Sequence, residues 1–227
     1  MKIIAIGDLH GKDCWKGVDI KKYDTIIFIG DYTDSYVLPN EAIYESLLQL
    51  IALKKANPEK VILLLGNHDI QYLFFPDFRC SGFRPESQSD LTALFLSNTE
   101  CFQVAFQHMN YLFTHAGVSN SWMNQFTDLK DAFKREKNSM SDALNKVYHS
   151  ENYSSLFDVG KIRGGSSDFG GILWADESET NSDYLKGVHQ IVGHSPMETI
   201  TTYGDSHSSI TYIDVLDTKT EFYELIV

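Results

Sequence analysis

Residues 2–11 read KIIAIGDLHG, a β-branched apolar run that ends in Gly-Asp-Leu-His-Gly. A short apolar run that stops at turn residues is typical of a buried strand. Asp8 and His10 follow it two positions apart, so both side chains can point into one site from an extended strand end. Open α/β folds usually bind their ligands on loops at the ends of strands. We therefore expect a strand over residues 2–6 with a ligand site at its end.

Four further apolar runs end at polar residues in the same way, and we expect each of them to be a strand. The Asp, Asn and His residues that follow these runs combine oxygen and imidazole ligands, which suits Mn, Fe, Zn or a similar divalent metal. A carboxylate can bridge two such ions, and a pair of ions about 3.5–4 Å apart can hold both oxygens of a phosphoryl displacement. The runs with their polar residues are Thr25–Ile29 with Asp31 and Asp34, Val61–Leu65 with Asn67 and His68, Tyr111–Thr114 with His115, and Gln190–Val192 with His194.

A helix is expected between the second and third runs, because apolar residues recur there at helical spacing. Asn40 can cap its start, and Asn57-Pro58 stops it. The first half of the chain is therefore predicted to run strand, loop, strand, helix, strand. The apolar stripe of this helix consists of Ile43, Leu47, Leu50 and Ile51, widened by Leu48.

The second half of the chain has weaker patterns. Residues 217–219 are expected to form a hairpin turn between the last two strands. Residues 74–89 have no regular pattern and are expected to form a rim or cap, and residues 151–169 read as a loop. The predicted helices cover 119–137 and 139–149, and the predicted closing antiparallel strands cover 199–203, 209–215 and 220–227.

The composition limits the classes of partner. The chain has 19 Lys and Arg residues against 31 Asp and Glu residues, which gives a formal net charge of −12. This acidity argues against a long nucleic acid as partner, because such binders need basic residues against the phosphates. A small anionic substrate stays possible, since a bound metal ion supplies local positive charge. The length of 227 residues predicts a single domain over 1–227, with helical or loop insertions near 70–100 and 119–170.

Cysteine usage and hydropathy bear on the compartment. Cys14, Cys80 and Cys101 are an odd number at wide spacings, which predicts free thiols in a reducing cytoplasm and no disulfide framework. The first apolar run is too short for a signal peptide, and no later run is long enough to span a membrane. We expect a soluble cytoplasmic protein with no membrane partner.

Taken together, the strand-end motifs resemble the five ordered motifs of the calcineurin-like metallophosphoesterase superfamily. The version here is similar to the phosphoprotein phosphatases and the bacterial diadenosine tetraphosphate hydrolases, and the resemblance extends from residue 7 to about residue 196. It implies an α/β sandwich of two mixed β-sheets flanked by helices, with the site at the strand ends. The motifs are Gly7-Asp8-Leu9-His10-Gly11, Gly30-Asp31-Tyr32-Thr33-Asp34, Gly66-Asn67-His68-Asp69, His115-Ala116-Gly117 and Gly193-His194-Ser195-Pro196.

The resemblance also implies a role for each site residue and a cofactor. It implies two divalent metal ions, drawn from Mn, Fe, Zn, Ni and Mg with Mn favoured, and hydrolysis of a phosphate ester by attack of a metal-bound hydroxide. His68 would be the general acid that protonates the leaving oxygen, and Asp34 would orient it. The metal ligands would be Asp8 and His10 on the first ion, Asp31 bridging both ions, and Asn67, His115 and His194 on the second.

Three positions depart from the family pattern. Phosphoprotein phosphatases continue the second motif with an Arg that clamps phosphate, whereas here Asp34 is followed by Ser35-Tyr36. Asp69 stands where those phosphatases favour Glu, and Pro196 stands where many relatives have a metal-binding His. His207, beyond the last motif, is expected to be a surface residue. An arginine from a loop could replace the missing clamp, and the candidates are Arg79, Arg84 and Arg163.

The sequence leaves the substrate open. The expected activity is that of a phosphomonoesterase similar to protein phosphatases, and the alternative is a nucleotide hydrolase of the dinucleoside polyphosphate type. A nucleotide would favour a pocket walled by the aromatic segment 74–84, but we expect its phenylalanines to pack among themselves. The acidic residues 176–179 are expected to form a solvated loop. Outside the enzymes, a metal-bound scaffold without catalysis would use the same residues.

Overall fold

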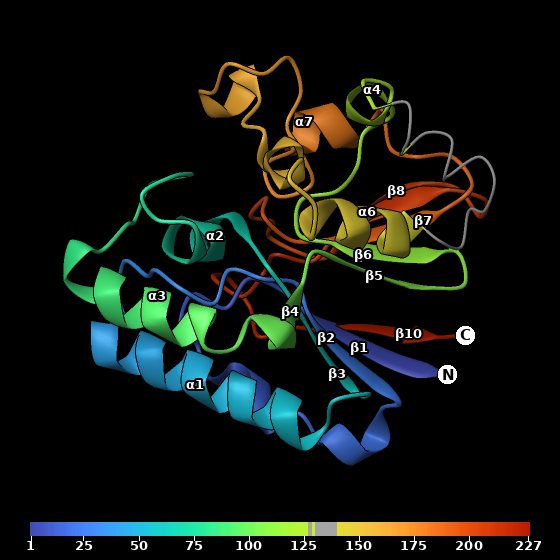
Figure 1. Ribbon diagram of the computed structural model, residues 1–227. Coiled ribbons are helices and arrows are strands. Elements are labelled where there is room, and N and C mark those ends of the chain that lie inside the picture. Colours follow the sequence, from blue (N-terminus) through green and yellow to red (C-terminus); the bar gives the residue numbers. More distant parts are fainter. Residues whose placement is uncertain (127–128, 130–139) are drawn as a thin grey trace.

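The computed structural model describes residues 1–126, 129 and 140–227, and its centre is a pair of five-stranded β-sheets (Figure 1). Each sheet mixes parallel and antiparallel neighbours, which confirms the predicted sandwich of two mixed sheets flanked by helices. The first sheet has the order β10 (Tyr223–Ile226), β1 (Lys2–Ile6), β2 (Thr25–Phe28), β3 (Val61–Leu64) and β4 (Phe102–Gln103). The second sheet has the order β5 (Ala105–His108), β6 (Tyr111–Thr114), β7 (His189–Val192), β9 (Ser209–Tyr212) and β8 (Thr201–Gly204).

Strand direction decides where the loops meet. β1, β2, β3 and β4 are parallel neighbours, and so are β6, β7 and β9, while β10, β5 and β8 run antiparallel at the edges. The carboxyl ends of parallel strands emerge at the same edge of a sheet. The loops after β1, β2 and β3 therefore lie together, as do those after β6 and β7. Contacts of His194 with Asp8 and Asn67 join the two sets of loops.

The period of two along each strand divides the core into two layers. Ile3 and Ala5 of β1 face the second sheet and pack with Phe113 of β6 and Ile191 of β7. Ile4, between them in sequence, faces the other way, into the larger cluster formed with the helices. Both faces of the first sheet are covered, which explains why its strands read as continuous apolar runs.

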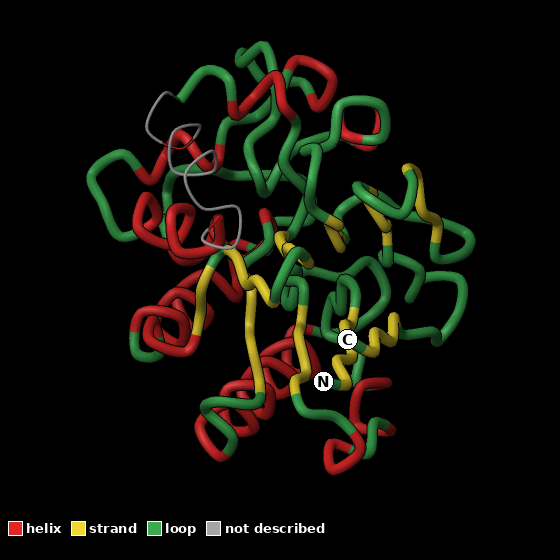
Figure 2. Tube along the Cα trace, turned by 90° about the vertical axis from the view of Figure 1, so that its right-hand side faces the viewer, coloured by secondary structure: helices red, strands yellow, loops and turns green. Residues whose placement is uncertain are grey.

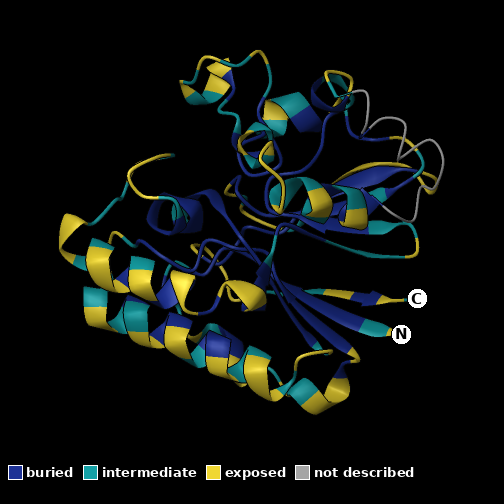
Figure 3. Cartoon of the chain, viewed as in Figure 1, coloured by how far each residue is buried: buried dark blue, intermediate teal, exposed yellow. Residues whose placement is uncertain are grey.

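Helices cover the outer faces of the sheets, as Figure 1 shows. α1 (Asn40–Ala56) and α3 (Gln88–Leu96) lie along the first sheet, and α6 (Met140–Tyr148) packs on β5 of the second. Asn145 of α6 fixes this contact, because its Nδ2 donates to the carbonyl of Ala105 at 2.8 Å. In Figure 3 the inner strands β1, β2 and β3 are buried almost throughout, whereas the edge strand β10 and the outer sides of α1 and α3 are exposed. The other helices described are α2 (Asn67–Leu73), α4 (Asn120–Met123) and α7 (Glu177–Thr180).

The two ends of the chain meet at the edge of the first sheet. Figure 2 shows them side by side, and the backbone N–H of Val227 donates to the carbonyl of Met1 at 3.0 Å. Lys2 faces Ile226 in the antiparallel register of β1 and β10. The prediction of a hairpin at 217–219 is therefore wrong, because β10 pairs with β1 and not with β9.

Other local predictions need correction. Pro39, not Asn40, is the cap of α1, and the Asn40 side chain instead contacts Glu86 and Arg84. Leu48 is 41% exposed and does not belong to the buried stripe, whereas Asn57 ends the helix as predicted.

Of the two helices predicted in the second half of the chain, one is confirmed and the other is described only in part. α6 confirms the helix predicted over 139–149. Of the helix predicted over 119–137, the structure describes the short α4, a turn at residues 124–125 and a helical Leu129. Residues 127–128 and 130–137 of that prediction lie outside the described residues.

Candidate metal centre

The predicted site residues lie directly after the carboxyl ends of five strands, β1, β2, β3, β6 and β7. Asn67 and His68 occupy the first turn of α2, and the others lie in loops. Several have positive φ, a conformation that is uncommon for residues with a side chain and that clusters at functional turns. These residues are His10 (47°), Asp31 (53°), Asp34 (57°) and His194 (66°).

Asp31 lies at the middle of the cluster and is 2% exposed. Its Oδ2 is 3.4 Å from Nε2 of His115 and 3.9 Å from Nε2 of His10. Its Oδ1 accepts the backbone N–H of His68 at 2.9 Å. Burial opposes ionisation, but the charges of His115 and His68 hold the pKa of Asp31 well below its ordinary value. Asp31 therefore stays a carboxylate that faces imidazoles on two sides.

Asp8 joins the two sheets, because its carboxylate accepts the backbone N–H of His194 at 3.0 and 3.2 Å. Gly193 makes this approach possible, since a Cβ there would lie 2.1 Å from Oδ1 of Asp8. Burial and the charge of Asp214 raise the pKa of Asp8 well above its ordinary value. A cation beside Asp8 would offset this unfavourable burial of charge.

Three more possible metal-ligand side chains converge on the other side of Asp31. Oδ1 of Asn67 is 3.0 Å from Nε2 of His115 and 2.9 Å from Nδ1 of His194. Nδ1 of His115 lies 3.0 Å from the carbonyl of Ile29, which can accept its proton and leave a lone pair on Nε2. Burial and the positive charges of His115 and Arg163 hold the pKa of His194 well below its ordinary value, so His194 is neutral.

The donor set fits divalent metal ions. Ligand atoms of Asp31, His115 and His194 lie within 4.8 Å of one another, and so do those of Asp8, His10 and Asp31. The two groups share Asp31, the arrangement expected of a bridging carboxylate. Nε2 of His194 is also buried without a hydrogen-bond partner. Carboxylate oxygens mixed with imidazole nitrogens suit Mn, Fe or Zn.

His68 borders this cluster and is paired with Asp34. Nδ1 of His68 lies 2.8 Å from Oδ2 of Asp34, and Gln71 and Tyr72 of α2 also donate to that carboxylate. Burial lowers the pKa of His68, but the charge of Asp31 and the hydrogen bond to Asp34 raise it to about 12 overall. His68 therefore keeps its proton.

Asp69 belongs to the third motif, but the motif itself predicts no role for it. It is fully buried and accepts the backbone N–H groups of Asp31 at 2.8 Å, Tyr32 at 2.9 Å and Gly66 at 2.9 Å. It thereby ties the loop after β2 to the start of α2. The signal was available, because an acidic residue at the third position of a helix is a capping residue.

Asp214, which follows β9, is a second residue that no motif revealed. It is 6% exposed and lines the cavity over the cluster. Burial and the charge of Asp31 raise its pKa to about 7. It is one more acidic group in a cavity that also holds Asp8 and Asp31.

The cavity over these residues has a volume of about 590 Å³. Of the candidate arginines, only Arg163 lines it; Arg84 binds the carbonyls of Ser35 and Leu38, and Arg79 stacks 4.5 Å over the ring of Phe83. Arg163 is held by Asp176, with Nε 2.7 Å from Oδ2, and donates from Nη2 to Oγ of Ser195 at 3.0 Å. Asp176 also caps α7, so the prediction that 176–179 is a solvated loop is wrong.

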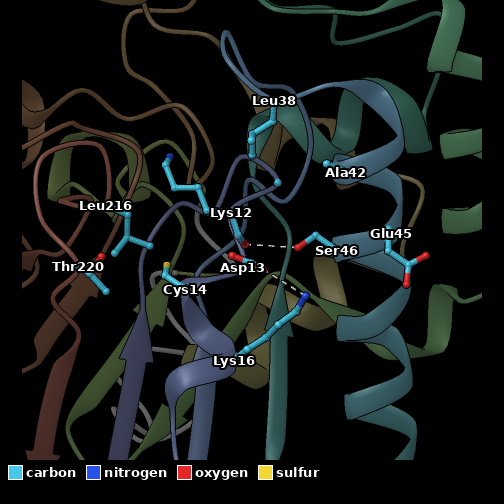
Figure 4. A pocket seen from close by; sticks show the side chains of 11 residues that line it. Lys12, Asp13, Cys14, Lys16, Leu38, Ala42, Glu45, Ser46, Leu216 and Thr220 are labelled. Carbon is cyan, nitrogen blue, oxygen red and sulfur yellow. Dashed lines mark hydrogen bonds and ion pairs between the residues drawn. The ribbon is translucent and has the colours of Figure 1, made fainter.

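A second cavity, of about 480 Å³, adjoins the first at Lys12, which lines both (Figure 4). Lys12 is paired with Asp217, with Nζ 2.6 Å from Oδ1. Lys16 is likewise paired with Asp13, as Figure 4 shows. The lysines of this second cavity thus already have their charges balanced by aspartates. The possible metal ligands line the first cavity instead.

The remaining candidates lie outside the centre. His207 has an 89% exposed side chain beside Asp205, in agreement with the expected surface position. The phenylalanines of segment 74–84 pack on each other and on their neighbours: Phe74 stacks on Tyr153 at 4.8 Å, and Phe75 stacks on Phe83 at 5.7 Å. Of this segment, Ser81 alone lines the 590 Å³ cavity.

A comparison with protein families agrees with this geometry. The model of the calcineurin-like phosphoesterase family matches residues 1–208. The chain belongs to this family. Calcineurin-like phosphoesterases use divalent metal ions, and the chain is accordingly a metal-dependent phosphoester hydrolase. The resemblance stated from the motifs is thereby confirmed.

Solved structures of phosphatases are similar to this calcineurin-like chain. A cold-active protein-tyrosine phosphatase from a psychrophilic Shewanella species has 17% identity and a TM-score of 0.58, over 99% of this chain and 75% of that one. Another cold-active protein tyrosine phosphatase structure has 16% identity and a TM-score of 0.54, over 99% and 73%. A protein serine/threonine phosphatase from Saccharomyces cerevisiae has 16% identity and a TM-score of 0.41, over 96% and 56%. At these identities the first two structures show a shared fold.

Three further observations complete the description. No match to this chain is found among curated proteins. No helix within residues 1–126, 129 and 140–227 is both long enough and apolar enough to cross a bilayer. The three cysteines are free thiols, as predicted.

Proposed function

We propose that the chain is a binuclear metal-dependent phosphomonoesterase that acts on phosphorylated side chains of proteins. The observation that carries the proposal is the sharing of Asp31 between two groups of donor atoms in one cavity. Two adjacent cationic sites joined by one carboxylate are the arrangement that clamps a phosphoryl group during displacement. An isolated structural metal would not need this second group.

The ligands of each proposed metal site come from loops that follow different strands. One ion would be held by Asp8, His10 and Asp31. The other would be held by Asp31 with Asn67, His115 and His194. When bound, the ions would balance the charge of the phosphate and lower the pKa of a water that attacks phosphorus. Manganese is the proposed metal, on the resemblance of the motifs.

His68 is proposed as the general acid. Its raised pKa keeps both ring nitrogens protonated, and Nδ1 is turned toward Asp34. From Nε2, His68 can then give a proton to the leaving oxygen as the phosphorus–oxygen bond breaks. Gln71 and Tyr72 support the role of Asp34, because they hold its carboxylate in one orientation.

Arg163 is proposed to replace the missing phosphate clamp. It lines the same cavity as Asp8 and His194, and its guanidinium is held in place by Asp176 and Ser195. A planar guanidinium can donate two parallel hydrogen bonds to phosphate oxygens. The loop that carries Arg163 would therefore supply the phosphate contact that the second motif lacks.

The walls of the cavity favour a protein substrate. Tyr36 and Val37 line it and are each 85% exposed, which offers apolar contact to residues beside a phosphorylated side chain. The aromatic segment that would have walled a nucleotide pocket packs on its neighbours instead. One observation supports the nucleotide alternative, since the exposed ring of Tyr36 could stack on a base.

The test is a substrate panel with manganese and the wild-type chain. Phosphoserine, phosphothreonine and phosphotyrosine peptides are compared with mononucleotides and dinucleoside polyphosphates by kcat/KM, with Asp31→Asn as the inactive control. We expect the phosphopeptides to be preferred. Preference for a nucleotide, abolished in Tyr36→Ala, would establish the alternative. Absence of hydrolysis across the panel would indicate a metal-bound scaffold.

We also propose a cytoplasmic location and a single domain over residues 1–227. Three free thiols support a reducing cytoplasm. The single domain predicted over residues 1–227 agrees with a site built jointly from both sheets.

A further inference from the structure

A third group of metal-binding side chains lies beside the proposed catalytic pair. Ligand atoms of Asp34, His68 and Cys80 are within 4.8 Å of one another. Asp34 and His68 belong to the second and third motifs, whereas Cys80 comes from the irregular segment after α2. Cys80 takes no part in either of the groups that share Asp31.

Several contacts hold the thiol in this position. The backbone N–H of Cys80 donates to Oε1 of Gln71 at 3.1 Å, and its Sγ is 3.7 Å from Nδ2 of Asn67. Gly82, with φ of 77°, turns the segment back over the group. A Cβ on Gly82 would lie 3.3 Å from Cβ of Asp34 and 3.7 Å from Cε1 of His68, so the absence of a side chain lets the segment close on both.

The chemistry of the group differs from that of the catalytic pair. Cysteine, histidine and aspartate together are a zinc-type ligand set, with tetrahedral geometry completed by water. A thiolate selects Zn²⁺ or the softer Cd²⁺ over Mn²⁺ and Mg²⁺. The group also has access to solvent, because His68 lines the cavity and Cys80 is only partly buried.

We propose that Asp34, His68 and Cys80 form a third, inhibitory site for Zn²⁺. The binding itself depends only on these three residues, whereas the inhibition rests on the proposed function of His68. On binding, the thiol releases its proton to solvent and sulfur coordinates the ion. The ion takes the place of the proton between Nδ1 of His68 and Oδ2 of Asp34, which lie 2.8 Å apart, and that proton is released to solvent as well. His68 is then a neutral metal ligand and no longer an imidazolium, so its remaining N–H is too weak an acid to protonate the leaving oxygen efficiently.

The test uses the whole chain saturated with manganese. Cd²⁺ is titrated while the ultraviolet absorption of the cadmium–thiolate bond is recorded, and Zn²⁺ inhibition of aryl phosphate hydrolysis is measured separately. Cys80→Ser should keep the basal activity, lose the absorption band and raise the inhibitory Zn²⁺ concentration by about tenfold or more, since even an outer hydrogen-bond partner of a metal ligand is worth about that factor. Cys14→Ser, which removes another partly exposed thiol, should behave like the wild type.

The outcomes separate this site from the proposed function. Equal Zn²⁺ inhibition of wild type and Cys80→Ser, or a band that survives in Cys80→Ser, would overturn the third site. Cys80→Ala serves as the second variant if Cys80→Ser does not fold. A chain that hydrolyses no phosphate ester but shows the Cys80-dependent band would refute the proposed function and leave the metal site standing.

Discussion

His68 is the residue whose chemistry is most sharply defined, because Asp31 and Asp34 raise its pKa to about 12 although it is largely buried. His68→Asn should therefore lower kcat by about 10²–10⁴-fold, the usual effect of losing a general acid. The loss should be larger for alkyl phosphates than for nitrophenyl phosphate, whose leaving group needs no proton. Manganese content, measured on the same samples, should not change. An equal loss for both substrates would refute the acid role.

Arg163 is the residue proposed to bind the phosphate of the substrate. Removing a charged hydrogen bond costs about 1.5–3 kcal/mol, so Arg163→Ala should lower kcat/KM roughly 10–150-fold. Arg79→Ala is the matched control, because Arg79 stacks on Phe83 and does not line the cavity. Inorganic phosphate should also inhibit the variant less strongly than the wild type. Similar kinetic losses in both variants would remove Arg163 from the site.

The sequence motifs contain the residues proposed as metal ligands, but they did not reveal other residues that lie beside these ligands. Asp8 and Asp31 could be found because each follows an apolar run directly, and the structure brings them into one cavity. Their catalytic roles stay predictions. Asp214 also lies two residues after a strand, β9, but the strand predicted over 209–215 enclosed it. Cys80 follows no apolar run, since its position depends on how the segment after α2 folds back over the strand ends.

Among the elements, the turn from β7 to its loop needs a glycine. In Gly193→Ala the new Cβ would lie 2.1 Å from Oδ1 of Asp8, so Asp8 would have to move away from the cluster. We expect loss of manganese binding and of hydrolysis, with the chain still folded by circular dichroism. Gly17→Ala is the control, because nothing lies within 4 Å of the Cβ it would introduce. Full metal content in Gly193→Ala would contradict the placement of Asp8.

Elements were predictable where local pattern decides them. β1, β2, β3 and α1 follow from apolar runs and helical spacing and are observed, whereas the short β4 and β5 were not predicted. The failures involve partners far apart in sequence. β10 pairs with β1 across almost the whole chain, so no turn signal near 217–219 could reveal it. Asn40 reads as a cap, but Glu86 and Arg84 from a distant loop engage its side chain.

For the whole molecule, the metal centre should link stability to pH. In the metal-free chain, burial and Asp31 raise the pKa of Asp214 to about 7, and Asp31 and Asp8 raise that of His115 to about 9 against the effect of burial. Both groups bind protons more tightly when folded. Their contribution to stability is therefore present at low pH and is lost as pH rises through about 7 and then about 9.

Metal ions should replace those protons, so the stabilisation by manganese should grow as pH rises toward 9. At a free concentration of 100 times Kd, the gain is about 2.7 kcal/mol, or roughly 5–10 °C in Tm for a chain of this size. Thermal melts with manganese or with a chelator across this pH range measure it. A manganese-induced shift that is constant or shrinks with pH would contradict the proposed ligands.

The overall architecture could be predicted from the sequence because the five family motifs occur in order along most of the chain. The shape of the cavity was not, because Tyr36, Arg163 and Trp174 reach its wall from loops without periodic pattern. The net charge of −12 likewise gave no sign of a centre whose side chains are proposed to hold cations. Substrate preference therefore has to be read from the walls of the cavity.

One carboxylate, Asp31, is proposed to join two metal ions. Manganese bound per chain, measured together with its electron paramagnetic resonance spectrum in wild type and Asp31→Asn, tests it most directly. We predict two spin-coupled ions per wild-type chain and no coupled pair in Asp31→Asn, which should also lose hydrolysis. A fully active wild-type chain with a single ion, or a coupled pair that persists in Asp31→Asn, would contradict the bridging role of Asp31.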